Sequence, residues 1–282
     1  MTDDQALHVD VDVDLDVVGT GPVPLLLLHG GSGRRQWFDA MSALLTEDAR
    51  MVRPDLPGHG GSPPTPGRYR LQDSAAAAAA VLDADGAGPA WVFGHSHGAH
   101  VAAVLAADRP DLVRGLLLGD APMSRDRMRA HQEDTAAMNR AWRELTDASL
   151  SPDERTRHFL DLPVAPGPGA PTIRDLFGPD HPYVAEMVTS LGHHDGDFLD
   201  AVLLRFDETY ERLTDDLLEA IDVPVVLLRA DPAAGGLVTD DDVAHLREHV
   251  PHLRVRRLVG VGHGLQLQDP EQVARAVRES IA

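Results

Sequence analysis

A serine between two glycines is the residue of this chain best suited to chemistry. Gly94, Ser96 and Gly98 fit the pattern G-x-S-x-G, which places a serine on a sharp turn between a strand and a helix. A short apolar stretch at 91–93 precedes it, and an apolar, alanine-rich run at 101–107 follows it. A hydroxyl held on such a turn is exposed, and amides of the helix behind it can stabilise developing negative charge. The pattern therefore predicts a nucleophile at Ser96.

A second stretch that could contact a ligand is the glycine-rich segment at 29–33, His29-Gly30-Gly31-Ser32-Gly33, which follows an apolar run. Backbone N–H groups come close to a ligand where glycines stand at the carboxyl end of a buried strand. A plain tight turn is the alternative. In a later loop, 56–62, we expect His59 to shape the loop by hydrogen bonding rather than to act as a catalyst.

The chain has 15 histidines, so metal binding has to be considered. Two groups of neighbours could supply ligands: His95, His97 and His100, and His193, His194 and Asp195. The side chains at 95 and 97 flank the serine of the turn and should point to different sides of it. We therefore expect no metal ion and no cofactor.

The composition narrows the class of protein. Acidic residues outnumber basic ones by 45 to 25, for a formal charge of −20, so neither nucleic acid nor an anionic membrane is an expected partner. Cysteine is absent, which excludes disulfides and a thiolate nucleophile. The start of the chain is acidic and no apolar run reaches membrane-spanning length. We expect a cytoplasmic protein with a small-molecule substrate; the oligomeric state is open, a homodimer being one option.

The elements around these residues alternate. Valines and a leucine alternate with aspartates over 9–17, which predicts a strand with one solvated face whose aspartates discourage edge-to-edge pairing. Further strands are expected at 24–28, 51–55, 91–95 and 114–120, with helices at 35–46, 72–82 and 97–107. Alternation of this kind predicts an α/β fold with a mostly parallel sheet and helices on both of its faces.

The alternation stops after Asp120. Helical segments are expected around 127–146, 152–160, 183–190 and 198–220, interrupted by a loop at 163–171. A strand at 223–230, a helix at 240–249, a strand at 253–259 and a helix at 270–281 then resume the sheet pattern. We therefore predict a core domain, residues 1–120 and 222–282, and an inserted helical cap, residues 121–221. Gly30 and Trp142 are the expected substrate contacts.

Together these pieces resemble the α/β-hydrolase family. The matching stretches are His29-Gly30-Gly31, the loop 55–62, the turn 94–98 and Gly260-Val261-Gly262-His263, and the resemblance covers nearly the whole chain. In that family a catalytic triad runs Ser, acid, His along the chain, and backbone amides form an oxyanion hole. The resemblance implies a mostly parallel central sheet, an inserted cap and serine hydrolase chemistry.

Residue by residue, the resemblance implies that Ser96 is the nucleophile and His263 its base. The orienting acid is then Asp231, which follows its strand directly. Asp120 is the alternative acid, because some family members draw the acid from the end of the preceding strand. The backbone amides of Gly31 and His97 are the expected oxyanion hole.

The implied function is hydrolysis of a carboxylic ester or lactone of a small, largely apolar substrate through an acyl-enzyme. Alternatives on the same triad are a C–C bond hydrolase, a proline iminopeptidase-like amidase and a cofactor-free haloperoxidase. His97 stands where proline iminopeptidases usually have tryptophan, which disfavours that option. From a different class, a non-catalytic ligand-binding receptor could keep the same fold.

Overall fold

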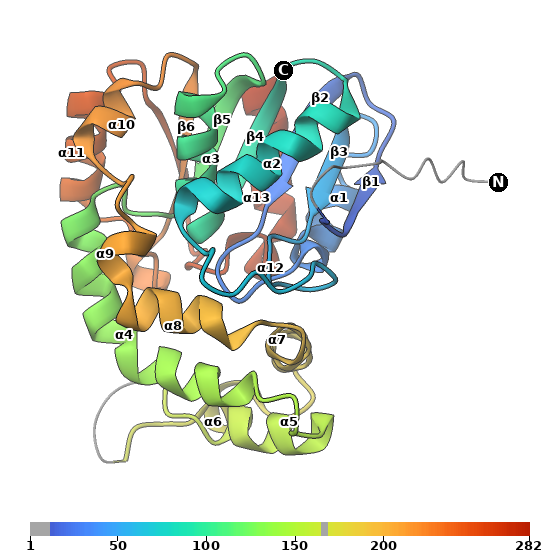
Figure 1. Ribbon diagram of the computed structural model, residues 1–282, viewed down its shortest axis with the longest axis vertical. Coiled ribbons are helices and arrows are strands. Elements are labelled where there is room, and N and C mark those ends of the chain that lie inside the picture. The colour runs from blue at the N-terminus through green and yellow to red at the C-terminus, as the bar shows by residue number, and fades with distance from the viewer. Residues whose placement is uncertain (1–11, 165–168) are drawn as a thin grey trace.

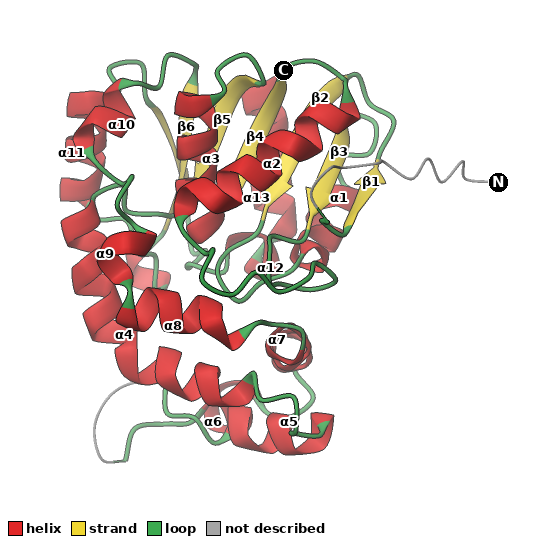
Figure 2. Ribbon diagram, in the orientation of Figure 1, coloured by secondary structure: helices red, strands yellow, loops and turns green. Residues whose placement is uncertain are grey.

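In the part of the chain described by the computed structural model, residues 12–164 and 169–282, seven strands form one sheet in the order β1-β3-β2-β4-β5-β6-β7 (Figures 1 and 2). The strands are β1 (Leu15–Val18), β2 (Val23–Leu28), β3 (Ala49–Pro54), β4 (Ala90–His95), β5 (Val113–Gly119), β6 (Val225–Ala230) and β7 (Arg254–Leu258). Strand β1 is antiparallel to β3, and the other neighbouring pairs are parallel. The predicted mostly parallel α/β sheet is confirmed.

The helices before β6 are the 3-10 helix η1 (Arg35–Phe38), α1 (Asp39–Ala43), α2 (Leu71–Asp85), α3 (His97–Asp108), α4 (Arg125–Leu145), α5 (Pro152–Leu160), α6 (Ile173–Phe177), α7 (Pro182–Gly192), α8 (Gly196–Leu204), α9 (Phe206–Thr209) and α10 (Asp215–Glu219). After β6 come the 3-10 helix η2 (Pro232–Ala234), α11 (Asp240–His249), α12 (Leu265–Gln268) and α13 (Pro270–Ile281). None of the helices in the described part of the chain combines the length and the apolar character that crossing a bilayer requires.

The core lies on both faces of the sheet because successive strand residues point to opposite faces. On β2, Leu26 and Leu28 pack into one cluster with α2, α3, α10 and α11, whereas Leu25 and Leu27 pack into the other with α1 and α13. All four leucines are buried. Complete burial of such a side chain stabilises the fold by about 1.5–3 kcal/mol, so the run of leucines specifies a central strand covered on both faces.

The edge strand differs from the expectation. Of the alternating segment, Val9 and Val11 lie outside the described residues, and strand structure begins only at Leu15. The expected solvated aspartate face is confirmed only in part. The side chains of Asp14 and Asp16 are 42% and 38% exposed. Asp16 also accepts hydrogen bonds of 2.6 and 2.7 Å from the guanidinium group of Arg53, which lies opposite it on β3, and Val17 is 37% exposed. An arginine on the neighbouring strand therefore makes the simple apolar-in, polar-out pattern incomplete.

The segment between β5 and β6 forms only helices and loops in its described part, as expected. Helices α4 to α8 lie beyond the carboxyl ends of the parallel strands (Figure 1). The helix expected over 198–220 is broken into α8, α9 and α10. Phe206 and Leu218 pack in the same cluster as the sheet, and α10 contacts α3 and α11. The end of the predicted cap thus packs with the core, and the division at 121–221 stays a prediction.

Candidate active site

The turn after β4 holds Ser96 in a conformation that few serines adopt. Its φ is 53° and its ψ is −119°, in a region that costs about 1–3 kcal/mol for a residue with a Cβ. A Cβ at Gly94 would collide with the backbone oxygen of Gly98, and one at Gly98 would collide with the carbonyl oxygen of Leu28. Both glycines are therefore needed for the turn to pack between β2 and α3.

Three side chains that follow three parallel strands meet at this turn. The Oγ of Ser96 lies 3.1 Å from Nε2 of His263, and Nδ1 of His263 lies 2.9 Å from Oδ2 of Asp120. Asp120 follows β5, and His263 lies between β7 and α12. Because the carboxyl ends of parallel strands share one edge of the sheet, residues far apart in the sequence are brought together. The arrangement is a hydroxyl, an imidazole and a carboxylate in line.

The carboxylate of Asp120 is buried and fully hydrogen bonded. Besides His263 it accepts hydrogen bonds from the backbone amides of Ala230 (3.2 Å), Leu237 (2.9 Å) and Val238 (3.3 Å). Burial by itself would raise the pKa of Asp120, but the hydrogen bonds from His263 and from these amides outweigh it and hold the pKa below its usual value. The side chain is therefore a carboxylate at neutral pH.

The first choice of acid, Asp231, is wrong in the structure. Its carboxylate is exposed and accepts hydrogen bonds from the backbone amides of Ala233 (3.0 Å) and Gly260 (2.9 Å), so that it caps η2 instead of facing His263. The segment 231–238 folds back over the strand end and brings two of its amides to Asp120. The alternative acid, Asp120, occupies the position behind the imidazole.

The glycine-rich segment lies against the serine turn. A Cβ placed on Gly30 would lie 3.3 Å from Cβ of Ser96, and one on Gly31 would lie 3.8 Å from Cβ of His97. Gly31 and His97 also border the same cleft as Ser96. The two residues expected to supply oxyanion amides thus lie next to each other beside the nucleophile.

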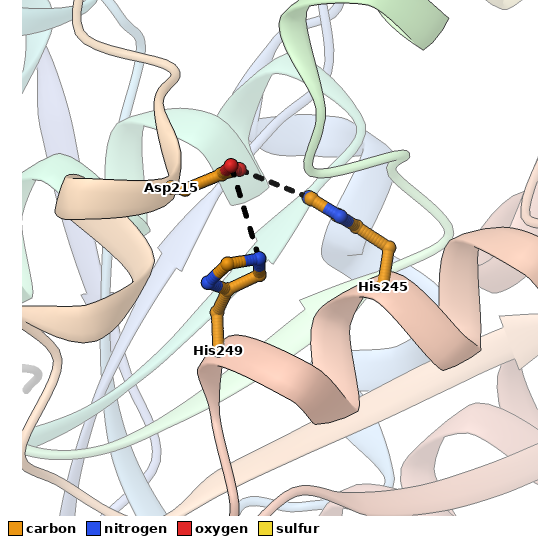
Figure 3. A group of neighbouring side chains, drawn as sticks. All are labelled: Asp215, His245 and His249. Atoms are coloured by element: carbon orange, nitrogen blue, oxygen red, sulfur yellow. Dashed lines mark ion pairs between the residues drawn. The ribbon is translucent and has the colours of Figure 1, made fainter.

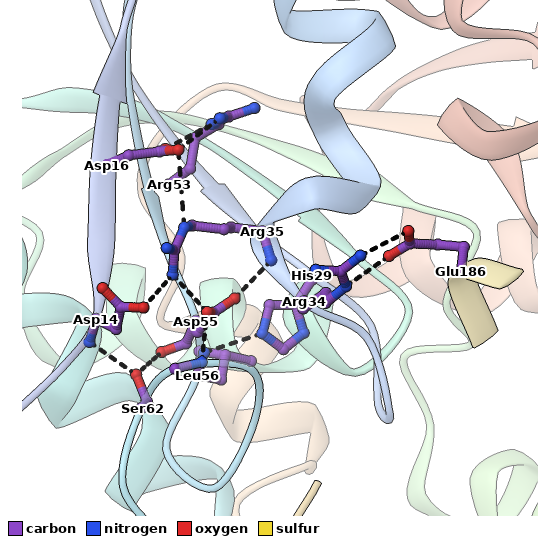
Figure 4. A network of polar contacts seen from close by, with 11 residues as sticks. Asp14, Asp16, His29, Arg34, Arg35, Arg53, Asp55, Leu56, Ser62 and Glu186 are labelled. Carbon is purple, nitrogen blue, oxygen red and sulfur yellow. Dashed lines mark hydrogen bonds and ion pairs between the residues drawn. The ribbon is translucent and has the colours of Figure 1, made fainter. Parts of the chain in front are cut away.

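A polar network fixes the end of this segment (Figure 4). The carboxylate of Asp55 accepts hydrogen bonds from the backbone amides of Arg35 (2.6 Å) and Gly61 (2.9 Å). The guanidinium group of Arg35 bonds both Asp55 (2.5 Å) and Asp14 (2.6 Å). The stretch 55–62, which contributed to the family resemblance, therefore has a structural role in bracing the residues just after the glycines.

Two histidines complete the support of the glycine-rich segment. His29 donates from Nδ1 to the carbonyl oxygen of Gly30 and accepts at Nε2 from the amide of Leu56, at 2.8 and 2.9 Å. His59 donates from Nδ1 to the carbonyl of Pro57 (3.0 Å) and accepts at Nε2 from the amide of Ser32 (3.3 Å). The predicted structural role of His59 is confirmed.

The histidines near the serine have separate partners. His95 donates from Nε2 to the backbone carbonyl of His263 at 2.7 Å, and burial lowers the pKa of His95 to about 3. His97 packs edge-on against Phe198 with ring centroids 5.0 Å apart, whereas His100 donates to the carbonyl of Pro122 at 2.9 Å. The three rings thus do not converge on a common point. The role of His95 beside His263 was not predicted, because it depends on a contact between residues 168 positions apart.

In the second histidine group, His193 is exposed, whereas His194 is buried and donates from Nδ1 to the carbonyl oxygen of Asp195 at 2.8 Å. The carboxylate of Asp195 accepts a hydrogen bond from the hydroxyl of Tyr69 at 2.5 Å. These side chains, too, have separate partners.

A cleft of about 1000 Å³ opens at the hydroxyl of Ser96, between the sheet edge and helices α4, α7 and α8. Its lining is mainly apolar and includes Trp37, Met128, Met138, Trp142, Phe177, Tyr183, Met187, Phe198, Leu199, Val202, Tyr210, Leu237 and Leu267. Gly30 and Trp142, the predicted substrate contacts, both border it. Phe159 and Phe206, which the sequence could not sort from these, pack into hydrophobic clusters instead.

An ion pair that the sequence did not predict joins the sheet to the helices over it. Arg34, next to the glycine-rich segment, forms hydrogen bonds of 2.7 and 2.8 Å to the two carboxylate oxygens of Glu186 on α7 (Figure 4). Glu186 is the one acidic side chain among the described residues that border the cleft. Its charge is therefore neutralised within the protein.

Comparison with known proteins agrees with this geometry. Residues 25–276 match the model of the alpha/beta hydrolase family. The chain belongs to this family and is a hydrolase.

An esterase of Mycobacterium tuberculosis is 30% identical over 268 residues, which cover 90% of this chain and 81% of that protein. Among solved structures, a marine microorganism esterase has a TM-score of 0.74 at 17% identity, covering 96% of this chain and 100% of that one. An N-acyl homoserine lactone degrading enzyme has a TM-score of 0.71 at 20% identity, covering 96% and 99%. The first of these relatives supports ester hydrolysis as the class of reaction, and the two solved structures show the shared fold.

Proposed function

We propose that Ser96, His263 and Asp120 form the catalytic triad of a carboxylic ester hydrolase. The observation that carries the proposal is the pair of distances at the floor of the cleft, 3.1 Å from Ser96 Oγ to His263 Nε2 and 2.9 Å from His263 Nδ1 to Asp120 Oδ2. A hydroxyl is a weak nucleophile at neutral pH, and an imidazole within hydrogen-bonding distance can take its proton as it attacks. The ionised Asp120 favours the imidazole tautomer that accepts this proton.

The reaction then follows in two halves. Ser96 Oγ attacks the ester carbonyl carbon while its proton passes to His263 Nε2, and the backbone amides of Gly31 and His97 stabilise the oxyanion. His263 returns the proton to the departing alcohol, which leaves an acyl group on Ser96. His263 then takes a proton from a water molecule, which attacks the acyl carbon, and returns that proton to Ser96 Oγ as the bond to the acyl group breaks and the acid is released. Loss of one oxyanion donor costs about 3 kcal/mol in related reactions.

The shape and charge of the cleft favour a neutral, apolar substrate. Its volume of about 1000 Å³ is at the upper end of the range of about 300–1,000 Å³ typical of ligand sites, so a substrate larger than the small one expected from the sequence fits better. Its single acidic side chain among the described residues, Glu186, is paired with Arg34. A substrate with a free amino group would find no free carboxylate there, which argues against a proline iminopeptidase-like activity.

Residues 121–221 are the proposed cap. Met128 and Trp142 on α4, and Tyr183 on α7, border the cleft from the side opposite Ser96's turn, so the cap would supply most of the substrate contacts. A lactone is a cyclic ester and would react at the same serine.

Labelling with a fluorophosphonate, together with p-nitrophenyl esters of increasing acyl length, tests the proposal. We expect labelling at Ser96 that is lost in Ser96→Ala and His263→Ala, and kcat/KM that rises with acyl length. A native, folded protein that neither reacts with the probe nor hydrolyses any ester or lactone would instead identify the non-catalytic receptor.

A further inference from the structure

A second group of chemically capable side chains lies on α10 and α11, outside the lining of the cleft. His245 and His249 are four residues apart on α11, so their rings project from the same face of the helix. Asp215, at the start of α10, faces both rings (Figure 3). One nitrogen or oxygen atom from each of the three residues lies within 4.8 Å of the others.

The distances within this group are close to those in a metal site, although some are longer. Nε2 of His245 lies 3.3 Å from Oδ1 of Asp215, and Nε2 of His249 lies 3.8 Å from Oδ2 of Asp215 (Figure 3). Tetrahedral Zn²⁺ with bonds of about 2.0–2.2 Å places neighbouring ligand atoms about 3.3–3.6 Å apart. Side-chain rotations that move the ligand atoms by about an ångström or less would bring all three to these separations.

A fourth residue orients one of the rings. Nδ1 of His249 lies 3.1 Å from Oε1 of Glu219 on α10 and can donate its proton there. A histidine that donates one ring N–H to a carboxylate offers the lone pair of the other nitrogen, which is the arrangement found behind histidine ligands of zinc. In neutral His249 this lone pair then faces the negative carboxylate of Asp215.

Two electron-rich atoms that face each other repel unless a cation lies between them. Nε2 of His245 is shielded from solvent, and its contact with Asp215 does not have hydrogen-bond geometry, so it has no hydrogen-bond partner among the described residues. A metal ion shared by all three side chains would supply that cation. The shared ion uses both rings and the carboxylate at once, and it also accounts for the orientation of His249 by Glu219.

We propose that Asp215, His245 and His249 bind a Zn²⁺ ion, with a fourth position left for water. Such an ion would join α10 to α11. Helix α11 begins just after Leu237 and Val238, whose amides hold Asp120. The proposed role is therefore structural: the ion would stabilise the segment that supports the acid behind His263, without contacting substrate.

Calorimetric titration of ZnCl₂ into the full-length protein, stripped with EDTA and returned to neutral pH, tests this. We expect one saturable site per chain. Affinity should fall at least tenfold in His245→Ala and in Asp215→Ala. In His158→Ala, which removes an exposed histidine on α5, it should be unchanged. Saturating Zn²⁺ should also raise Tm in the native protein and in His158→Ala but not in His245→Ala.

His245→Gln serves as a second variant, since it keeps a polar side chain of similar length and avoids a loss of folding that could be mistaken for loss of binding. Absence of Zn²⁺ binding by the native protein would overturn the proposal. So would Zn²⁺ affinity that is unchanged in both His245 variants. Neither result would bear on the proposed esterase activity, because that activity is tested separately by labelling of Ser96.

Discussion

His95 and His263 are joined by a hydrogen bond of 2.7 Å from the imidazole Nε2 of the first to the backbone carbonyl oxygen of the second. The residue just before the proposed nucleophile therefore holds the loop that carries the proposed base. His95 is buried and burial lowers its pKa to about 3, so the ring stays neutral and keeps this donor at physiological pH. The serine turn and the histidine loop are thereby fixed relative to each other.

Replacing His95 should impair turnover more than binding. His95→Phe keeps a ring but removes the donor, so the partly buried carbonyl of His263 loses its partner; the full cost for a buried group is about 1–3 kcal/mol. We expect kcat to fall about tenfold or more with little change in KM, measured on a p-nitrophenyl ester. His95→Gln, which retains an N–H donor, should recover part of the loss. Equal kcat in the Phe variant and the native protein would show that the contact does not position His263.

Asp120 and Asp231 are distinguished by conservative variants. Asp120→Asn removes the charge behind His263, and a comparable change in a serine protease lowers kcat about 10⁴-fold. We expect a loss of about 10³–10⁴-fold in kcat for Asp120→Asn and less than about twofold for Asp231→Asn, because the latter only caps η2. The reverse order of losses would restore Asp231 as the acid.

The ion pair between Arg34 and Glu186 should matter for bulky substrates. Glu186→Gln leaves Arg34 without its charged partner and weakens the link between the glycine-rich segment and α7. We expect kcat/KM to fall several-fold for long-chain esters and less for acetate esters, measured on the same preparation. The matched control is Asp161→Asn, which breaks the exposed pair with Arg174; exposed pairs contribute only about 0–1 kcal/mol. An equal effect of the two variants would contradict this role.

Stability should fall unusually early on acidification. Burial lowers the pKa of His95 and His97 to about 3 and that of His100 and His194 to about 4, from 6.5. Between these values the unfolded chain binds more protons than the folded one, so the free energy of unfolding is fully present above pH 6.5 and decreases as the pH falls below it. Each such ring contributes a slope of up to about 1.4 kcal/mol per pH unit.

Urea unfolding curves recorded at a series of pH values between about 7.5 and 4.5, each fitted to a two-state transition, measure this slope. His97→Phe offers a specific check, because neither ring nitrogen of His97 has a hydrogen-bond partner within residues 12–164 and 169–282, and its neighbours Phe198 and Tyr210 are aromatic. We expect a shallower dependence on pH in this variant. An unchanged slope would mean that His97 is accessible to protons in the folded state.

The parts of the site that the sequence could predict are those determined locally. Ser96 was identified because strand, turn and helix are consecutive and the glycines at 94 and 98 have steric roles. His263 and the glycine-rich segment follow strands in the same way. Most strands could be predicted from apolar runs, since burial on both faces requires continuous apolar sequence.

What could not be predicted depends on contacts between distant segments. Asp120 and Asp231 both follow buried strands, and only the folding of the segment 231–238 back onto Asp120 separates them. The residues that line the cleft could not be predicted either, because the spacing of apolar residues in α4 does not show which side of the helix faces Ser96. The pair His245 and His249 was visible as i and i+4, but its carboxylate partner lies 30 residues earlier.

The bracing of Arg35 by Asp14 has a practical consequence for anyone shortening this protein. The carbonyl of Asp14 accepts from the amide of Asp55 at 2.8 Å, and its amide donates to Oγ of Ser62 at 2.9 Å, so residue 14 is tied to the loop 55–62 through main chain as well as side chain. Removing residue 14 would break these contacts and so weaken the support of the glycine-rich segment beside the nucleophile. Activity, more than solubility, should therefore set the limit for truncated variants.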